Sequence, residues 1–222
     1  MWGCEKDNIL EENNIDLFSF KHNVVFFVDG EEVSSILKQN YEDLLIVERQ
    51  EIDYENKIIT TERLGFTSEE GYINFGIANG YPLKEEREFV RKMREYIEIN
   101  NIEEYYEVNG KLPETYLEFE KNLYTSLFPE NKNVPSLLIG LVLSKEPYGM
   151  GPNWIAFIKT WPVMLPGWNN AVSSYQPIGL AGIVSFYSRT LYRDHLFTRV
   201  QWAMTWYNMG WADNSVSSWF RN

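Results

Sequence analysis

The stretch "GWADNSVSSWF", Gly210–Phe220, repeats the pattern of an earlier stretch, "GWNNAVSSYQP", Gly167–Pro177. In both stretches a tryptophan precedes an Asx-Asn pair, and two serines follow after two further residues. Asn169 and Asp213 are 44 positions apart (213 − 169). This is the length of a supersecondary unit rather than the period of a helix or a strand. The sequence therefore predicts a duplicated unit in this part of the chain.

The duplication extends beyond the two short stretches. Each unit starts with an apolar run and an aromatic tip, "LIGLVLSKEPYGMG" and "AGIVSFYSRTLYRDH", and continues through Trp-rich, β-prone sequence without helical periodicity. Such sequence indicates about four short strands in each unit. Two units of this kind favour a β-sandwich of two Greek keys. The 44-residue shift aligns Ile139 with Ile183, Ser144 with Ser188, Tyr148 with Tyr192, Val172 with Val216, and Ser173–Ser174 with Ser217–Ser218.

Charge divides the chain into two regions. The 222 residues carry a net charge of −12, which argues against a nucleic-acid groove lined by Lys and Arg. From Val134 onward there are six basic and three acidic residues, which leaves 14 basic and 29 acidic residues before that point. Seven of the eight tryptophans also follow Val134. We expect an acidic domain at residues 15–133 and a second domain at 134–222, joined near the polar stretch Pro129–Pro135.

The sequence pattern of the acidic region, β-prone runs followed by helical periodicity, predicts an α+β domain. Two hairpins are expected, one around the Asp-Gly turn within Asn23–Val33 and one within Leu44–Phe66 around "ENK". The spacing of apolar residues then predicts an amphipathic helix over Leu83–Ile99, and Pro113 opens another helix. The carboxylates of these helices are at solvent spacing, and His22 is expected to pack or cap. Residues 15–133 contain no phosphate loop, nucleophile elbow or His/Cys metal cluster, so no catalytic residue is assigned.

Cys4 is the one cysteine of the sequence, so an intramolecular disulfide is excluded. The surrounding "MWGCEKDN" resembles the start of a bacterial lipoprotein, in which the cysteine is lipidated after signal cleavage. No apolar signal stretch precedes Cys4 in this sequence, and a free thiol is the alternative. The resemblance implies a tether at residues 1–14 and an extracytoplasmic protein, held at the outer membrane or cell surface by lipid alone. The sequence has no run of about 18 apolar residues that could span a bilayer.

The duplicated unit resembles the βγ-crystallins. In that family a Greek key begins with a strand and a folded hairpin that bears an aromatic residue and glycine, as in Tyr148–Gly151. The key closes on the calcium motif (Asn/Asp)-(Asn/Asp)-x-x-(Ser/Thr)-Ser, which "NNAVSS" and "DNSVSS" both fit. The resemblance covers roughly residues 136–222 and implies up to two Ca²⁺ ions, each held by the loop of one key and the hairpin of the other. The ligands it implies are the Asx oxygens of Asn169, Asn170, Asp213 and Asn214, the backbone carbonyls of Ala171 and Ser215, and the hydroxyls of Ser173 and Ser217; Ser174 and Ser218 look structural.

Two features of these motifs bear on calcium binding. Calcium takes six to eight oxygen ligands, and the motifs contribute one carboxylate between them, Asp213. We therefore expect affinity in the range of roughly 10⁻⁴ to 10⁻³ M, with the Asp213 motif the tighter. Arg193 and His195 stand where the first hairpin has Gly149 and Gly151, so we expect a distorted second hairpin and some repulsion of a cation. Alternatively, both motifs are ordinary Asx/Ser turns.

Three classes of function remain open. The first is a non-enzymatic, calcium-binding surface lipoprotein with a structural or adhesive role. The second is an inhibitor or carbohydrate-binding module, which would use a surface glycan or protein as its partner. The third is an enzyme with an unrecognised site in the acidic region. Most tryptophans are expected in the core rather than on a sugar-stacking platform, and the adjacent Asp194 and His195 are expected to be solvated at a hairpin tip.

Overall fold

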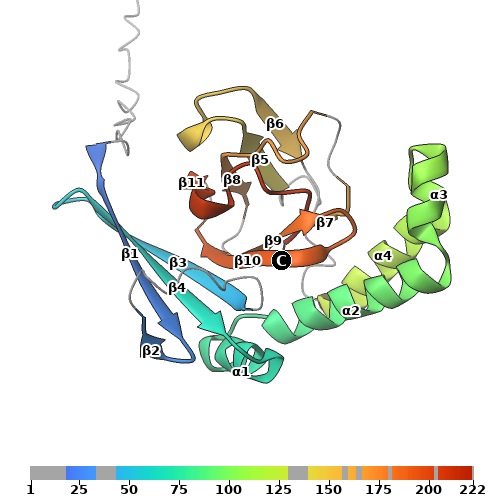
Figure 1. The fold of residues 1–222 in the computed structure, drawn as a ribbon, viewed down its shortest axis with the longest axis horizontal. Helices are drawn as coiled ribbons and strands as arrows, with labels where there is room; N and C mark the ends of the chain where they lie inside the picture. The colour runs from blue at the N-terminus through green and yellow to red at the C-terminus, as the bar shows by residue number, and fades with distance from the viewer. Residues whose placement is uncertain are drawn as a thin grey trace, which may run out of the picture.

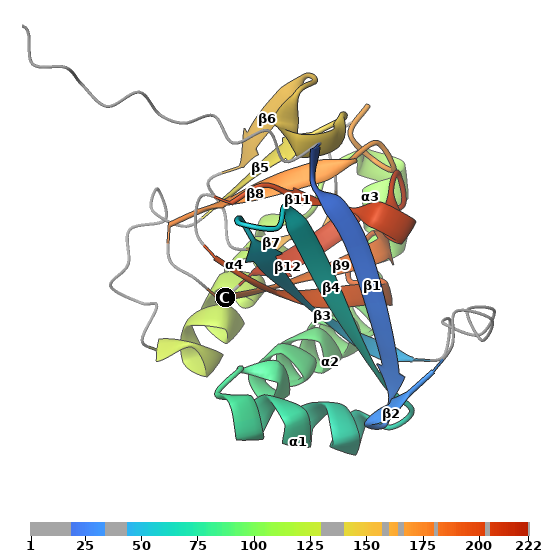
Figure 2. The same ribbon diagram turned by 90° about the vertical axis from the view of Figure 1, so that its left-hand side faces the viewer.

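The protein has three layers in its computed structural model: helices, a large sheet and a small sheet (Figures 1 and 2). Within the described residues the large sheet has eight strands in the order β2-β1-β4-β3-β10-β9-β12-β7, and the small sheet has four in the order β11-β8-β5-β6. The chain is therefore a mixed α and β protein. The structure describes residues 19–33, 44–129, 140–156, 160–163, 167–179, 182–202 and 205–221.

The two expected hairpins of the acidic region are present. Strands β1 and β2 pair across a turn in which Asp29 and Gly30 adopt positive φ angles of 49° and 90°. Strands β3 and β4 pair antiparallel along their whole length. The two hairpins are joined because β1 also pairs with β4, in parallel, a long-range pairing that the sequence did not predict. These strands are β1 (Lys21–Val28), β2 (Glu31–Glu32), β3 (Leu45–Asp53) and β4 (Ile58–Phe66).

Four α-helices follow β4 in the described part of the chain. The predicted amphipathic helix is α2, and the helix opened by Pro113 is α4. Two further helices, α1 and α3, were not predicted. The side chain of Ser68 caps α1 by accepting a hydrogen bond from the Gly71 N–H at 3.1 Å. The helices are α1 (Glu69–Asn79), α2 (Leu83–Ile99), α3 (Ile102–Asn109) and α4 (Glu114–Leu127). No helix in the described part of the chain is long and apolar enough to cross a membrane.

The duplicated region forms two sets of four strands that exchange one strand each. The first set supplies β5, β6 and β8 to the small sheet and β7 to the large sheet, and the second set supplies β9, β10 and β12 to the large sheet and β11 to the small one. The exchange interlocks the two sets. Their bounds are β5 (Gly140–Ser144), β6 (Asn153–Ala156), β7 (Thr160–Trp161), β8 (Ser174–Ile178), β9 (Gly182–Arg189), β10 (Arg193–Gln201), β11 (Tyr207–Asn208) and β12 (Ser218–Arg221).

The large sheet runs through both regions of the chain. Strand β3 pairs in parallel with β10, so that Val47 lies opposite Thr198 and Glu48 opposite Arg199. Most of the expected joint, residues 130–135, lies outside the described residues. The acidic region and the duplicated region therefore share one sheet, although their compositions differ.

Two hydrophobic cores lie on the two faces of the large sheet. The core under the helices combines both regions, because Phe89 of α2 packs against Tyr192 and Phe220 with ring centroids 5.6 and 5.1 Å apart. The core between the sheets includes Trp219 and Tyr175. Burial of such large aromatic side chains is the main stabilising term for both layers.

Candidate cation-binding site

The two Asx-Asn motifs lie against each other and exchange backbone hydrogen bonds. The N–H of Asn170 donates to the carbonyl of Val216 at 2.9 Å, and the N–H of Asn214 donates to the carbonyl of Val172 at 3.1 Å. The two donors are 44 residues apart from each other, and so are the two acceptors. The sequence repeat is therefore matched by a two-fold reciprocity in space between the two loops.

The two loops also share one backbone conformation. Asn170 and Asn214 have positive φ angles of 53° and 55°, a left-handed conformation that Asn tolerates better than most residues. Each of these asparagines is the third residue of a tight turn, which is closed by the Ala171 N–H donating to Trp168 O at 3.2 Å and by the Ser215 N–H donating to Ala212 O at 3.1 Å. The second Asn of each motif is thus required locally by the turn, whether or not an ion binds.

The second serine of each motif holds the neighbouring folded hairpin. The Ser174 hydroxyl accepts from the Gly149 N–H at 3.0 Å and donates to Glu146 O at 2.6 Å. The Ser218 hydroxyl accepts from the Tyr192 N–H at 3.3 Å and donates to the carbonyl of Arg189 at 2.7 Å. Both serines are buried. Their role is structural, as the sequence indicated.

The first serine of the second motif brings three oxygen atoms together. The Ser217 hydroxyl lies 3.0 Å from Oδ1 of Asn170 and 2.7 Å from the carbonyl oxygen of Ser188. One atom comes from each motif loop and one from β9. A hydroxyl has one proton, so it can donate to only one of these two acceptors. If the hydroxyl donates to the Ser188 carbonyl, the contact with Asn170 is completed either by the amide NH2 of Asn170 turned toward Ser217 or by a cation bound to Oδ1.

This oxygen set has the spacing and chemistry that calcium uses. Calcium binds hydroxyl, amide and backbone carbonyl oxygens at 2.3–2.6 Å, so neighbouring ligands lie about 3 Å apart. Ser217 is buried, whereas Asn170 is exposed, which leaves one side open to water ligands. The set consists of a hydroxyl, an amide and a carbonyl oxygen, none of which carries a formal charge. Among the described residues no group of three or more His, Cys, Asp or Glu side chains could hold a metal ion.

The other candidate ligands are placed differently. Asn169 and Asp213 are exposed at the starts of their loops, and Ser215 donates its hydroxyl to the Asp213 carbonyl at 3.3 Å. Ser173 is buried, with its N–H on Ser144 O at 2.9 Å. The contacts of the described residues thus join Asn170 to Ser217, and no contact brings Asn169, Ala171, Asp213 or Ser215 to that pair. The Ser188 carbonyl was not predicted, although the alignment of Ser144 with Ser188 was a usable signal.

The two folded hairpins differ in backbone conformation. The first has positive φ at Tyr148 and Gly149, 50° and 76°, and the second at Leu191, Tyr192 and Asp194, 59°, 59° and 53°. A Cβ atom on Gly149 would lie 2.2 Å from the Trp206 ring, so only glycine fits there. The second hairpin has Arg193 and His195 in place of Gly149 and Gly151, and its backbone conformation differs accordingly from that of the first hairpin.

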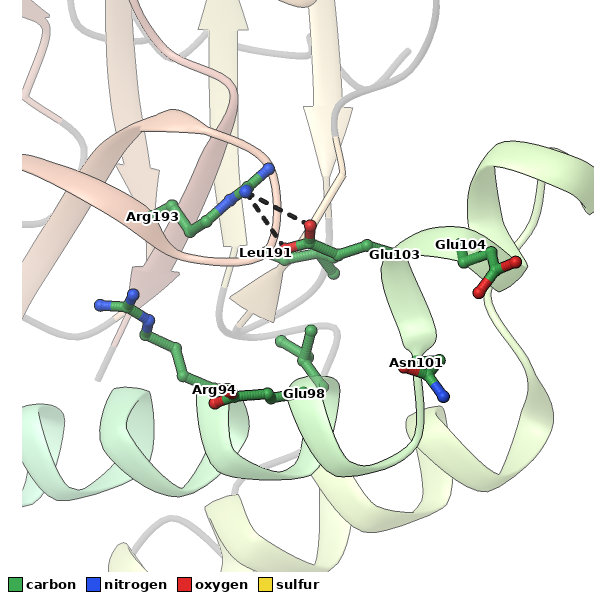
Figure 3. A pocket seen from close by; sticks show the side chains of 8 residues that line it. Arg94, Glu98, Asn101, Glu103, Glu104, Leu191 and Arg193 are labelled. Atoms are coloured by element: carbon green, nitrogen blue, oxygen red, sulfur yellow. Dashed lines mark hydrogen bonds and ion pairs between the residues drawn. The ribbon is translucent and has the colours of Figure 1, made fainter.

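Arg193 does not remain an isolated charge in the second hairpin. Its guanidinium pairs with Glu103 of α3 at 3.3 Å across a hollow of about 460 Å³ (Figure 3). The same hollow is lined by Arg94 and by two further glutamates, Glu98 and Glu104. The positive charge of Arg193, which was expected to repel a cation at the second hairpin, is therefore paired with Glu103 of the helical layer.

The expectation that Asp194 and His195 are solvated together is wrong for His195. A register shift between His195 and Phe197 turns the imidazole inward, against the rings of Tyr72 and Tyr187. Its Nε2 lies 3.0 Å from the Thr198 hydroxyl. Burial, with the nearby Arg87 charge, lowers the pKa of His195 to about 3. Asp194 is exposed and pairs with Arg189 at 2.8 Å.

The expectation of solvated carboxylates on the helices is wrong for Glu86 and Glu120, whereas no expectation was stated for Glu48 on strand β3. Glu86 of α2 and Glu120 of α4 are buried beneath the large sheet, and Glu48 of β3 is buried within it. The sequence showed that these glutamates lie on helices and a strand. It did not show their partners, which are hydroxyl groups and arginines from distant segments. These residues were missed because single glutamates are far more often exposed than buried.

The tryptophans with described side chains are mostly packed. Trp219 is fully buried, and the ring of Trp154 lies 5.8 Å from that of Trp219 and 5.7 Å from that of Trp168, measured between ring centroids. Trp202 is the exception, with 67% of its surface exposed.

His22 was expected to pack or cap. Its Nε2 lies at hydrogen-bond distance, 2.8 Å, from the Tyr148 hydroxyl.

Comparison with known proteins yields one structural neighbour to report. No protein-family model and no curated protein matches the sequence. The crystal structure of a betagamma-crystallin from an Archaea matches 38% of this chain and 98% of its own chain, with 19% sequence identity and a TM-score of 0.31.

Proposed function

We propose that this protein is a non-enzymatic calcium-binding protein whose duplicated region is a pair of βγ-crystallin-like Greek keys. The observation that carries the proposal is the meeting of Asn170 Oδ1, Ser188 O and Ser217 Oγ around a single hydroxyl proton. The oxygens come from the loops of both units and from β9, whereas the sequence resemblance implies an ion held by the loop of one key and the hairpin of the other. A second, pseudo-symmetric ion would use Asn214 with Ser173.

Calcium would act here as a clamp between the two units. The ion would bind lone pairs of three oxygens that belong to the two units, and the Ser217 hydroxyl would keep its proton and turn it away from the ion. An ion that binds only the folded state stabilises it by RT ln(1 + [L]/Kd), which is about 1.4 kcal/mol at a tenfold excess over Kd. The proposed role is therefore structural or adhesive, at the millimolar calcium concentrations found outside cells.

Calorimetric titration and thermal unfolding test calcium binding directly. We expect heat of binding and a rise of a few degrees in Tm at millimolar calcium. Ser173→Ala with Ser217→Ala should abolish both, because each change removes a hydroxyl oxygen without altering the backbone. Ser217→Ala alone should weaken binding more than Ser173→Ala alone. Absence of heat and of any Tm shift at 10 mM calcium, about a hundredfold above a Kd of 10⁻⁴ M, would show that the motifs are only turns.

We also propose that the protein is anchored outside the cytoplasm through a lipid on Cys4. Cys4 lies outside the described residues, and the support is the lipoprotein-like sequence around it. Acyl chains would hold the protein at a membrane without crossing it. The test is fractionation of the protein expressed from its natural gene: membrane association lost in Cys4→Ala supports the anchor, and a wild type already free of membranes contradicts it.

The exposed indole of Trp202 favours a second candidate function, binding of a surface glycan. Exposed aromatic rings supply flat apolar faces with polar rims, which suit one face of a sugar ring. The matched test is a glycan panel read by tryptophan fluorescence with wild type and Trp202→Ala. Binding lost in the variant supports this function, whereas equal signals from both proteins exclude Trp202 as the platform.

A further inference from the structure

Two buried carboxyl groups of the helical layer accept hydrogen bonds from tyrosines of the β9–β10 hairpin. Glu86 of α2 accepts a hydrogen bond from the hydroxyl of Tyr187, and Glu120 of α4 accepts one from the hydroxyl of Tyr192. Both glutamates and both tyrosines are buried. Figure 1 shows α2 and α4 on the side of the large sheet away from the small sheet. The two contacts therefore join the helical layer to the sheet.

Among the described residues, the groups that contact Glu120 are neutral. The hydroxyl of Tyr192 reaches it from the turn between β9 and β10, that of Thr160 from β7, and that of Tyr116 lies beside it on α4. Burial raises the pKa of Glu120 to about 7, although the hydrogen bonds from Tyr192 and Thr160 act in the opposite direction. Its charge state therefore changes within the physiological pH range.

Glu86 lies in a larger polar cluster. Burial raises its pKa as well, against the opposing charge of Arg87. The Ser185 hydroxyl bonded to Glu86 lies 2.7 Å from the Thr198 hydroxyl, which in turn contacts His195. The groups that face Glu86 are Tyr72 from α1, Arg87 on its own helix, and Tyr187 and Ser185 from β9, with Thr198 and His195 of β10 one hydrogen bond further away.

The same two tyrosines hold the second motif loop through their backbones. The carbonyl of Tyr187 accepts from the Ser217 N–H at 2.9 Å. The N–H of Tyr192 donates to the Ser218 hydroxyl at 3.3 Å. The residue after Tyr187 is Ser188, whose carbonyl lies against the Ser217 hydroxyl. Each tyrosine thus contacts a buried carboxyl group with its side chain and a motif serine with its backbone.

We propose that the helical layer is a proton-sensitive support of the second motif loop, in which ionisation of the buried Glu120 drives α4 away from the β9–β10 hairpin and so loosens the Ser217–Ser218 end of that loop. A buried carboxylate with only neutral donors is costly, and the cost is relieved when α4 separates from the hairpin and water enters. Calcium and protons would then act on the same loop. Only the calcium part of this inference rests on the proposed function.

Hydrogen exchange of calcium-free protein tests the proton part. Because the pKa of Glu120 is about 7 when buried and about 4.5 when open, loop opening should become roughly tenfold more frequent between pH 6 and pH 8.5. The readout is the protection factor of the Ser217 and Ser218 amides, corrected for intrinsic exchange. Glu120→Gln should remove the pH dependence, and the matched exposed control on α4, Glu118→Gln, should retain it. A pH dependence that is absent from the wild type, or equal in all three proteins, overturns the inference.

A second variant, Tyr192→Phe, tests the same link without relying on whether the Glu120→Gln protein folds. The Tyr192 hydroxyl favours the ionised form of Glu120, so Tyr192→Phe should move the midpoint of the protection profile to higher pH. An unchanged midpoint contradicts the assigned link. Addition of 10 mM calcium at pH 8.5 separates the two proposals: restored protection supports both, whereas pH dependence without any calcium effect supports the proton-sensitive support and refutes calcium binding.

Discussion

Arg199 and Glu48 form a buried ion pair that joins the two regions of the chain. The Nε–H of Arg199 donates to Oε2 of Glu48 at 3.0 Å, and the side chains are 2% and 0% exposed. Arg63 pairs with the other carboxylate oxygen at 2.6 Å. Burial alone would raise the pKa of Glu48, but the two arginines outweigh it and hold the pKa below its ordinary value. The pair lies where β3 meets β10, so it stabilises the one sheet that both regions share.

Glu48→Gln should strongly destabilise the protein. The change leaves the Arg199 charge buried without its counter-ion, and loss of one partner of a buried pair costs about 3–5 kcal/mol. Urea unfolding measures the difference. The matched control is Glu62→Gln on β4, whose partner Arg49 is far more accessible; that loss should be less than about 1 kcal/mol. Equal losses from both variants would mean that the buried pair does not hold the sheet together.

The contribution of Glu120 to stability should decrease as the pH rises from about 4.5 to about 7, while that of His195, whose folded-state pKa is lowered to about 3, increases up to its ordinary 6.5. The folded-state pKa of Glu120 is raised to about 7 from an ordinary 4.5, so its protonated form is favoured by folding. Its contribution is fully present below pH 4.5 and is lost as the pH rises through 7, by at most about 3 kcal/mol. Urea unfolding between pH 5 and pH 8 should show the loss as a difference in stability between wild type and Glu120→Gln that moves against the wild type as the pH rises, because the His195 contribution is common to both proteins. A profile with the same slope in the variant would assign the effect elsewhere.

Asn170→Gly should weaken calcium binding without damaging the fold. Glycine accepts the left-handed backbone that Asn170 requires, φ 53°, while the change removes the Oδ1 atom beside Ser217. We expect calcium affinity to fall about tenfold, the effect of roughly 1.4 kcal/mol, and the calcium-free Tm to change little. Asn214→Gly has the same backbone need, φ 55°, and tests the pseudo-symmetric site. If neither variant alters the calorimetric titration, the Asx amides are not ligands.

Gly149→Ala should be more damaging than a glycine substitution in an open turn. The new Cβ would lie 2.2 Å from the Trp206 ring, and Gly149 also has a φ of 76°. Gly80 has a similar φ of 70° but nothing within 4 Å of its Cβ position, so Gly80→Ala isolates the conformational cost of about 1 kcal/mol. Thermal unfolding should show a further loss of about 1–3 kcal/mol for Gly149→Ala. Equal losses would indicate that the ring moves freely.

Local patterns in the sequence predicted the local elements of this protein. The turn at Asp29–Gly30, the apolar face of Leu83–Ile99 and the 44-residue repeat each act over short distances or by self-similarity, and the structure has the corresponding hairpin, helix and paired loops. The repeated Asx-Asn motif also identified Asn170 and Ser217 as candidate ligands, because a turn of this kind presents its side-chain oxygens whatever surrounds it.

The tertiary structure decided what meets across the layers. Pairing of β3 with β10, the exchange of β7 and β11, and the meeting of Asn170 with Ser217 and the Ser188 carbonyl all join segments far apart in the chain. The same is true of Glu86 and Glu120, which look like surface residues by spacing but are buried against hydroxyl groups of the β9–β10 hairpin. Periodicity shows that a residue lies on a helix, but only the packed partner determines whether its carboxyl group faces water or a tyrosine.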